Sequence, residues 1–374
     1  MKALFWTLLF LIFYCYFGYP ILISLLSRYR ARAVRKSAIL PSVSIVIAAH
    51  NEADVLQAKL ASLAALDYPP EKIEILIGSD ASSDQTNAIL QRYQDPRLRR
   101  FIYSERQGKM SIVNALVREA NNEIIFFNDA RQRIEPKALQ NIVANFADPT
   151  VGCVSGELVF ISAETGTAQG VNLYWTYEKF IRNQEARLHS MLGATGAIYA
   201  IRRRLYVPAP TNVVLDDMFT PFKIIQQGYR AIFDGTAIAY DRAAPHADEE
   251  YRRKARTLYG NYQIFLLFAD LFNPFRSPIA IQLFSHKLLR VLVPFFMLAL
   301  LPVNFMLSNG GFYNAFLWLQ IFFYAAALTG AFKPSSKLCY VPYVFCLLNF
   351  AALAGFWRFI GTKQEITWQK ARLQ

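Results

Sequence analysis

Four long runs of apolar residues flank a more polar middle part of the chain. They cover residues 3–26, 290–308, 312–331 and 338–357 and carry almost no charge. Each is close to the roughly 20 residues that an α-helix needs to cross a bilayer. The first run is too long for the apolar part of a signal peptide and has no basic segment before it, so we expect a retained anchor. The pattern predicts a membrane protein with one N-terminal and about three C-terminal transmembrane helices.

Between these runs, short strand-like segments alternate with amphipathic helices. Val43–Ala49 and Ile73–Gly78 have the composition of buried strands, and the apolar residues of 53–66 recur at helical spacing. Two more strands, at 98–103 and 124–127, are separated by a helix over 109–120. Strands that alternate with helices usually form a parallel sheet covered on both faces. We therefore predict an α/β, Rossmann-like domain with a mostly parallel sheet.

The remaining segments complete the predicted division of the chain. Phe265–Phe275 is too short and too interrupted to span a membrane, and it is typical of an amphipathic helix that lies in the interface. The predicted parts are an anchor (1–27), a basic linker (28–40), the α/β domain (41–262), an interfacial segment (263–289), the C-terminal transmembrane helices (290–360) and a basic tail (361–374).

The net charge is +13, but the basic residues gather beside the apolar runs. We therefore expect no nucleic-acid partner. Basic residues follow the first run directly: Arg28, Arg30, Arg32, Arg35 and Lys36. By the positive-inside rule this end, with the α/β domain after it, faces the cytoplasm. The neutral link at 308–311 then faces outside, and the lysines near 333–337 face inside.

The basic tail conflicts with four complete spans. Four spans would place it opposite the α/β domain, although Arg358, Lys363, Lys370 and Arg372 favour the cytoplasm. Either one apolar run lies in the interface, or the tail departs from the rule. The four cysteines have no metal-ligand spacing, and we expect them to be reduced.

Polar residues stand at the ends of the predicted strands, where open α/β sheets bind ligands. They are Asn51, Glu52, Asp80, Lys109 and Asp129. Carboxylates such as Glu52 and Asp80 can accept hydrogen bonds from a nucleoside, and Lys109 at a helix start suits a phosphate. Alternatively, Asp80 only caps a helix, Asp129 only begins a loop, and Lys109 is solvated.

The order of these motifs resembles the membrane-anchored and processive family 2 glycosyltransferases, which include cellulose, chitin and hyaluronan synthases. The segments HNEADVL, IGSDASSDQT, RQGKMSIVNAL and FFNDARQRIEP carry the resemblance, which extends from Pro41 to about Gln263. It implies a GT-A fold and a nucleotide-diphosphate sugar donor, usually with a UDP carrier. Glu52 and Asp80 would then contact the nucleoside, with Asn51 beside them and Lys109 near the donor.

The resemblance also places Asp129 on the first acid of the family's DxD motif, which holds Mg²⁺ or Mn²⁺. The third position of that motif is Arg131 in this chain. Asp129 alone can hold the cation when diphosphate oxygens and water complete the shell, because Mg²⁺ keeps several waters. Alternatively, Arg131 itself contacts the diphosphate or a sugar hydroxyl.

The second half of the domain is expected to bind the acceptor. The stretch 193–199 carries Gly193, Thr195 and Gly196, and glycines allow a close backbone approach to a ligand; a simple tight turn is the alternative. Leu215–Met218 resembles the family's ED motif, which implies Asp217 as catalytic base and Asp216 as a residue that orients its neighbours.

The end of the domain resembles the family's QxxRW motif with two departures. Arg253 takes the glutamine position, Thr257 takes the tryptophan position, and Arg256 is retained. Arginines suit a diphosphate, although the same residues fit a basic helix on the membrane surface. Synthases of long polymers generally keep the motif, so its loss counts against processive synthesis. Upstream aromatic residues near 174–177 are either core or a sugar-stacking surface.

The sequence therefore predicts an inverting, metal-dependent glycosyltransferase of a bacterial inner membrane, with its catalytic domain in the cytoplasm. The acceptor would be a hydroxyl of a glycan or lipid-linked molecule. The C-terminal helices either form a channel that works with polysaccharide-export partners or only anchor the enzyme. The alternatives are a polyprenyl-phosphate sugar synthase and a non-catalytic membrane receptor or transporter, although the apolar runs have almost none of the ionisable residues that a transporter needs.

Overall fold

The computed structural model describes residues 1–161, 166–242, 247–332 and 337–361, with the backbone alone for 166–174, 242, 247–253 and 337. The chain forms two compact units. The sheet domain contains 30–161 and 185–243, and the helical domain contains 1–29, 162–184 and 244–364.

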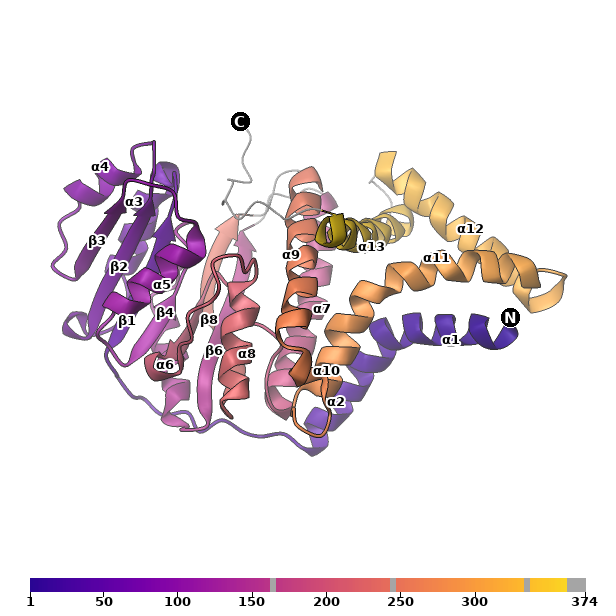
Figure 1. The fold of residues 1–374 in the computed structure, drawn as a ribbon, viewed down its shortest axis with the longest axis horizontal. Coiled ribbons are helices and arrows are strands. Elements are labelled where there is room, and N and C mark those ends of the chain that lie inside the picture. The colour runs from indigo at the N-terminus through magenta and orange to yellow at the C-terminus, as the bar shows by residue number, and fades with distance from the viewer. Residues whose placement is uncertain (162–165, 243–246, 333–336, 362–374) are drawn as a thin grey trace. The chain divides into compact units, whose positions relative to one another are not determined.

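An eight-stranded mixed sheet forms the core of the sheet domain, in the order β3-β2-β1-β4-β7-β6-β8-β5 (Figure 1). Its strands are β1 (Val43–Ala49), β2 (Ile73–Asp80), β3 (Leu98–Tyr103), β4 (Ile124–Phe127), β5 (Arg133–Ile134), β6 (Val151–Ile161), β7 (Tyr199–Arg202) and β8 (Arg230–Arg242). The first four strands are parallel, as the alternating pattern predicts. The short strands β5 and β7 run antiparallel to their neighbours. The predicted fold class, a mostly parallel α/β sheet, is confirmed.

Helices cover this sheet. They are α3 (Ala53–Ala64), α4 (Thr86–Arg92), α5 (Lys109–Glu119), α6 (Ala138–Val143) and α8 (Asp216–Gln226), with 3₁₀ turns at Pro70–Lys72, Ala144–Ala147 and Arg203–Leu205. All seven residues of β1 are buried, which requires cover on both faces of the sheet. At Gly78 in β2 an added Cβ would overlap Ile112 of α5, so this glycine allows α5 to pack closely on the sheet.

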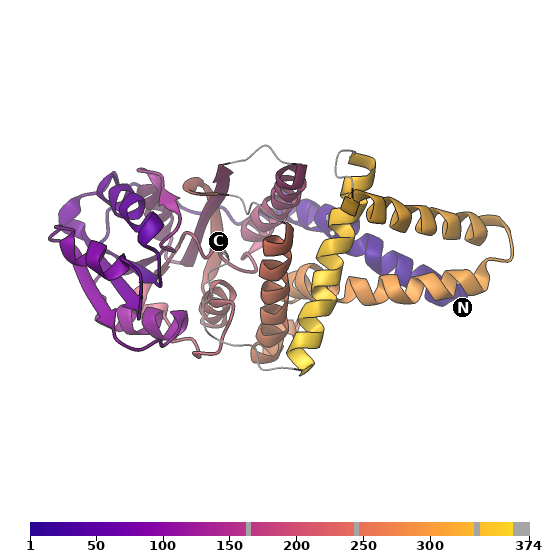
Figure 2. The ribbon, with the colours of Figure 1, turned by 90° about the horizontal axis from the view of Figure 1, so that it is seen from above.

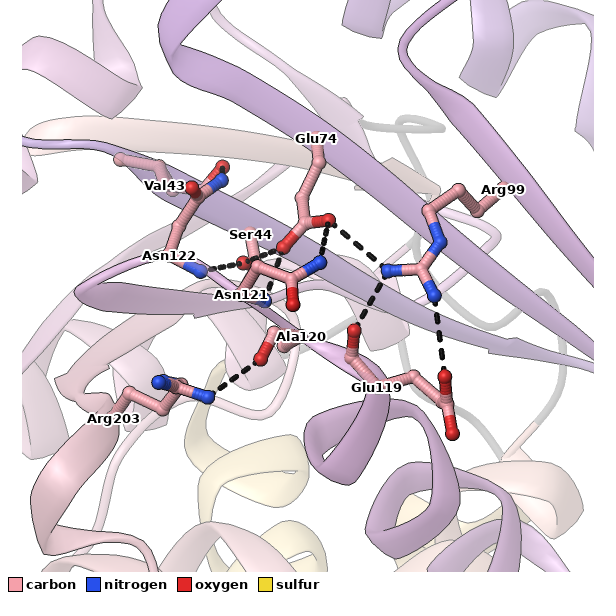
Figure 3. Close-up of polar contacts among 9 residues, drawn as sticks. All are labelled: Val43, Ser44, Glu74, Arg99, Glu119, Ala120, Asn121, Asn122 and Arg203. Atoms are coloured by element: carbon pink, nitrogen blue, oxygen red, sulfur yellow. Dashed lines mark hydrogen bonds and ion pairs between the residues drawn. The ribbon is translucent and has the colours of Figure 1, made fainter.

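A polar network holds the turn between α5 and β4 (Figure 3). The Glu74 carboxylate on β2 accepts hydrogen bonds from the Ser44 hydroxyl at 2.5 Å and the Asn121 N–H at 2.6 Å. Arg99 on β3 bridges Glu74 at 3.3 Å and the Glu119 carbonyl at 2.7 Å. Three parallel strands are thereby tied to this turn. Lys109 is the first residue of α5, and Asp129 follows β4. The network therefore holds α5 and β4 at the ends opposite to these two residues.

The helical domain has α1 (Lys2–Phe13), α2 (Tyr19–Tyr29), α7 (Gly166–Leu188), α9 (Ala247–Leu267), α10 (Ala280–Gln282), α11 (Leu289–Leu307), α12 (Gly311–Phe332) and α13 (Lys337–Gly361), with a 3₁₀ turn at Ala269–Phe272. Single π turns at Tyr14–Gly18 and Leu283–Leu288 join α1 to α2 and α10 to α11. The last few residues of α7 belong to the sheet domain.

In the described residues, four helices are long and apolar enough to cross a membrane: Lys2–Tyr29, Ala280–Leu307, Gly311–Phe332 and Leu338–Gly361. Their number and order agree with the predicted one plus three. The second helix begins at Ala280 rather than at 290, because α10 and the π turn continue into α11. The polar residues His286, Lys287 and Arg290 had hidden this extension from the hydropathy pattern.

The three helices α1, α11 and α12 run side by side, while α13 lies across them (Figures 1 and 2). Phe5 and Leu8 pack against Leu300 and Val303, whereas Cys15 packs against Leu289 and Val293. As the residue number rises along α1, the number of the residue in contact with it on α11 falls, so these two helices are antiparallel.

Candidate active site

A lysine joins the two halves of the predicted site. The Lys109 Nζ, on the first residue of α5, lies 3.0 Å from Asp129 Oδ1 and 3.3 Å from Asp216 Oδ2. Burial would lower the pKa of Lys109, but the carboxylates of Asp129, Asp216 and Asp217 outweigh it and raise that pKa above its usual range. Lys109 and Asp129, two of the strand-end residues singled out from the sequence, therefore lie together with Asp216 of the second half of the domain.

Asp80 holds the loop before α5 in place through hydrogen bonds. This carboxylate is fully buried, and its two oxygens accept the backbone N–H groups of Gln107 at 2.7 Å and Gly108 at 2.9 Å. Gly108 has a φ of 87°, a left-handed conformation that glycine adopts without strain. Asp80 therefore fixes the point from which Lys109 extends. The expected contact of Asp80 with a nucleoside stays a prediction.

The loops after β1 and β2 are tied together by Asn51. Its Oδ1 accepts N–H groups from Ser83 at 2.8 Å and Asp84 at 3.4 Å, and its φ is 53°. Asp84 in turn accepts the N–H of Thr86, the first residue of α4, at 2.9 Å. The Glu52 N–H donates to the Thr86 hydroxyl at 2.8 Å. Asn51 and Glu52 thus lie at the same edge as Asp80.

The loop after β4 shows what Arg131 contacts. The Arg131 Nη2 lies 2.9 Å from Asp241 Oδ2 on β8, and that carboxylate also accepts a 2.9 Å hydrogen bond from Gln132. Asp241 is buried, whereas the Arg131 side chain is 43% exposed. Arg131 therefore braces the loop that carries Asp129 and still reaches solvent.

Lys59 is a residue that the sequence analysis missed. It lies on α3, is 1% exposed, and donates a 2.8 Å hydrogen bond from Nζ to the Gln132 carbonyl in the same loop. Burial lowers the pKa of Lys59 to about 7, although Asp129 partly opposes this effect. The available signal was its position among Leu56, Leu60 and Leu63 on the apolar face of the helix predicted for 53–66.

The second half of the site surrounds the start of α8. Asp216 and Asp217 are the first two residues of this helix, where its dipole favours negative charge. Gly193 has a φ of 143°, and its added Cβ would lie 3.0 Å from Met218. At Gly196, an added Cβ would lie 3.6 Å from Asp217 Oδ2, so the backbone passes directly beside this carboxylate. Ala194 donates its N–H to the Asp217 carbonyl at 2.7 Å.

Thr195 and the neighbouring tyrosines close this part of the site. The Thr195 N–H donates to the Ser155 hydroxyl at 2.8 Å, and the residue is 7% exposed. Tyr199 stacks on Phe127, the last residue of β4, with ring centroids 4.5 Å apart. Burial and the nearby Asp216 raise the pKa of Tyr199 and of Tyr206, so both remain neutral hydroxyls.

Two predicted donor contacts belong to the helical domain. The side chain of Arg253 lies outside the described residues. Arg256 is an exposed residue of α9. Their contact with a donor diphosphate stays a prediction.

The residues around Asp129 fit a cation that is held chiefly by its substrate. In the described parts of the chain, no three acidic, histidine or cysteine side chains form a metal cluster. However, the Asp129 carboxylate already forms an ion pair with one cationic group, the Lys109 ammonium. A single carboxylate suits Mg²⁺ or Mn²⁺ that keeps water and phosphate ligands, because such ions bind few protein groups beside a nucleotide.

The chain is similar to several known proteins. Residues 44–207 match the family model described as Glycosyl transferase family 2. The Probable glycosyltransferase YdaM of Bacillus subtilis (strain 168) is 26% identical over 302 residues, which are 76% of this chain and 72% of that protein. A Poly-beta-1,6-N-acetyl-D-glucosamine synthase of Staphylococcus aureus (strain MSSA476) is 22% identical over 257 residues, 66% of this chain and 61% of that one.

Among solved structures, a mannosyltransferase from Pyrobaculum calidifontis in complex with GDP-Man and Mn²⁺ has a TM-score of 0.73 and 22% identity. The match covers 96% of this chain and 99% of that one, and it shows a common fold. Residues 44–207 are therefore similar to family 2 glycosyltransferases, as the motifs indicated, and the chain shares its fold with that mannosyltransferase.

Proposed function

We propose that the protein is an inverting hexosyltransferase. It moves a sugar from a nucleotide-diphosphate donor, with UDP as the first candidate, to a hydroxyl of a glycan or lipid-linked acceptor. The observation that carries this proposal is the position of Lys109, which links the carboxylate after β4 to Asp216 at the start of α8. This link supports the proposal that a donor site and a base act on one bond.

The donor side uses the groups at the strand ends. Glu52 and Asp80 contact the nucleoside, and Asn51 holds the loop between them. Lys109, Arg131, Arg253 and Arg256 supply positive charge to the diphosphate, for which guanidinium groups offer paired donors. Asp129 holds Mg²⁺ or Mn²⁺, which supplies further positive charge to the leaving group when bound.

The acceptor side uses the glycine-bearing turn and α8. Gly193, Thr195 and Gly196 shape the backbone beside Asp217, and Asp216 orients Lys109. Asp217 takes the proton of the acceptor hydroxyl while the hydroxyl oxygen forms a bond to the anomeric carbon of the sugar. The bond from that carbon to the diphosphate breaks in the same step, so the configuration inverts. General base catalysis of this kind contributes about 10²–10⁴-fold in rate.

The protein is proposed to act in polysaccharide biosynthesis at a bacterial inner membrane, with the sheet domain in the cytoplasm. The basic residues after α2 support this orientation. The similarity to a poly-N-acetylglucosamine synthase supports a glycan product.

The test is donor turnover by the purified full chain in detergent or lipid. UDP-, GDP- and dTDP-sugars are supplied with Mg²⁺, with Mn²⁺ or with a chelator, and release of the nucleoside diphosphate is measured. We expect one donor class to be consumed, and the chelator to slow its consumption. If a folded preparation consumes no donor under any of these conditions, the proposal is wrong and a non-catalytic membrane protein becomes the better description.

A further inference from the structure

We propose that α13 lies in the plane of the membrane, at the interface on the side of the sheet domain, and does not cross the bilayer. Three helices then cross, and the C-terminal tail is on the same side as the sheet domain. This inference concerns the apolar surface of α13 and its lipid partner, and it does not depend on the proposed transfer reaction.

The first step is to define the two ends of the helix bundle. The near end is the one at which α2 leads into the sheet domain, and Cys15, Leu289 and Val293 lie toward it. The far end contains Phe5, Leu300 and Val303. On α12, Phe312 lies 6.4 Å from Phe5 between ring centroids, so α12 begins at the far end. Because α12 then runs back, its last turn at Gly330 is at the near end.

The second step follows α13 along its length. Its first turn touches the end of α12, because an added Cβ at Gly330 would overlap the Cys339 carbonyl. In its middle, Asn349 Nδ2 lies 3.2 Å from the Tyr16 hydroxyl, in the π turn between α1 and α2. Near its end, Phe356 packs 5.1 Å from Phe295 on α11.

The last turns of α13 fix the direction of the helix. Phe359 lies 5.8 Å from Tyr259 and 5.7 Å from Tyr262 between ring centroids, and both tyrosines are on α9. The Tyr262 hydroxyl in turn donates to the Val291 carbonyl at 3.5 Å, near the start of α11. From Cys339 to Phe359 a helix covers about 30 Å, enough to cross the hydrocarbon core. Yet its end is still at the near end of the bundle.

Charged side chains show that this near end is at the boundary of the hydrocarbon layer. Glu178 on α7 is buried against His286 at 3.2 Å and also pairs with Arg290, whose guanidinium lies 5.8 Å from the Tyr16 ring. On α9, the exposed Arg256 is one turn before Tyr259. Ionisable groups are costly at the centre of a bilayer, so this layer belongs at the interface.

The outer face of α13 has the chemistry of a lipid-facing surface. Its small buried residues, Ala351, Ala352 and Gly355, allow close packing on the protein, and an added Cβ at Gly355 would lie 3.0 Å from Leu258. Its exposed large residues are Leu338 (68%), Val341 (51%), Phe350 (56%), Trp357 (65%) and Ile360 (62%). Acyl chains would favour these exposed apolar side chains more than water would.

This arrangement removes the conflict in the charge distribution. With three crossings, the positive-inside rule assigns the three basic segments of the sequence, at 28–36, 333–337 and 358–372, to one side and the neutral link at 308–311 to the other. The positive-inside rule is then satisfied at every connection.

The test places single cysteines in the full chain and labels them in membrane vesicles of known orientation with an impermeant maleimide. Cys339→Ala removes the only partly exposed native thiol among the described residues, since Cys15, Cys153 and Cys346 are buried. Gly361→Cys reports the end of α13, where an added Cβ meets open space. Ser104→Cys marks the sheet domain, and Asn309→Cys marks the link between α11 and α12; both positions are exposed.

We expect Gly361→Cys and Ser104→Cys to be labelled in vesicles of one orientation and Asn309→Cys in the other. Labelling of Gly361→Cys together with Asn309→Cys would overturn the proposal. A second measurement uses spin labels at Val341→Cys, Phe350→Cys and Ile360→Cys to read depth in the bilayer. An in-plane helix gives three similar depths, whereas a spanning helix would separate the first and last by nearly 30 Å, roughly the rise of 19 residues, and would refute the proposal.

Discussion

Replacing Lys59 by methionine should stabilise the protein in a manner that depends on pH. The Lys59 side chain is buried on α3, and its pKa falls from 10.5 to about 7. Below pH 7 the native state must hold a buried charge that the unfolded chain holds in water. Each unit of pKa corresponds to about 1.4 kcal/mol, so the charge costs about 5 kcal/mol of folding free energy.

Methionine has a similar length and no charge, but it leaves the Gln132 carbonyl without the Lys59 hydrogen bond. Such a loss costs about 1–3 kcal/mol. The expected net gain is therefore about 2–4 kcal/mol at or below pH 7, or roughly 5–15 °C in melting temperature.

The pH dependence follows from proton binding. Between pH 7 and 10.5 the unfolded chain binds more protons at this position than the native state, so the stability of the natural protein rises with pH. The advantage of Lys59→Met should shrink across that window and turn into a small loss above it. The assay is thermal unfolding of the full chain in detergent at several pH values, followed by tryptophan fluorescence.

Lys72→Met is the matched control, because Lys72 also donates from Nζ to a backbone carbonyl, that of Leu40 at 2.7 Å, but is exposed. Lys72→Met removes a similar hydrogen bond but no buried charge, so this variant should not be stabilised. If Lys59→Met melts below the natural protein near pH 7, or by a margin that does not change with pH, the reasoning about the buried charge is wrong.

Three further predictions concern the site and its support. Burial opposes ionisation of Glu74, but hydrogen bonds from Ser44, Asn121 and Arg99 lower the pKa of this carboxyl overall. Glu74→Gln should therefore reduce the melting temperature at neutral pH. The difference in melting temperature should disappear as the pH falls through the lowered pKa of Glu74. An equal difference at pH 3 and pH 7 would contradict this. Gly193→Ala puts a side chain at a φ of 143° and 3.0 Å from Met218. We expect this variant to lose about 1–3 kcal/mol of stability and to transfer sugar more slowly. Gly361→Ala, at an open position, should change neither the stability nor the rate of transfer. Asp129→Asn should abolish the stimulation of donor turnover by Mn²⁺, and a titration that is unchanged from the natural protein would remove Asp129 from the metal site.

The parallel half of the sheet domain is predictable because its signals are local. β1, β2 and β4 are apolar runs of strand composition, and the residues after them come together since parallel strands end at one edge. Thus Asn51, Asp80 and Asp129 can be grouped from the amino-acid sequence alone.

Other parts of the site depend on partners distant in the sequence. Arg131 pairs with Asp241 on β8, and no local pattern indicates that a strand so late in the chain runs beside the loop after β4. Asp80 could be assigned to a ligand or a cap, but its bonds to Gln107 and Gly108 require the three-dimensional path of the loop. For α13, hydropathy gives length and composition and carries no information on direction.

The most direct test of the proposed chemistry is transfer to a hydroxyl acceptor by Asp217→Asn, with Glu71→Gln as an exposed control on the same domain. Donor binding is measured separately, so that loss of the base is distinguished from loss of the donor site. We predict that Asp217→Asn binds donor normally and transfers sugar about 10²–10⁴-fold more slowly. A loss of only about tenfold in the transfer rate would be smaller than a general base contributes. It would contradict the assignment of Asp217 as the base and favour a phosphate acceptor, which needs no base.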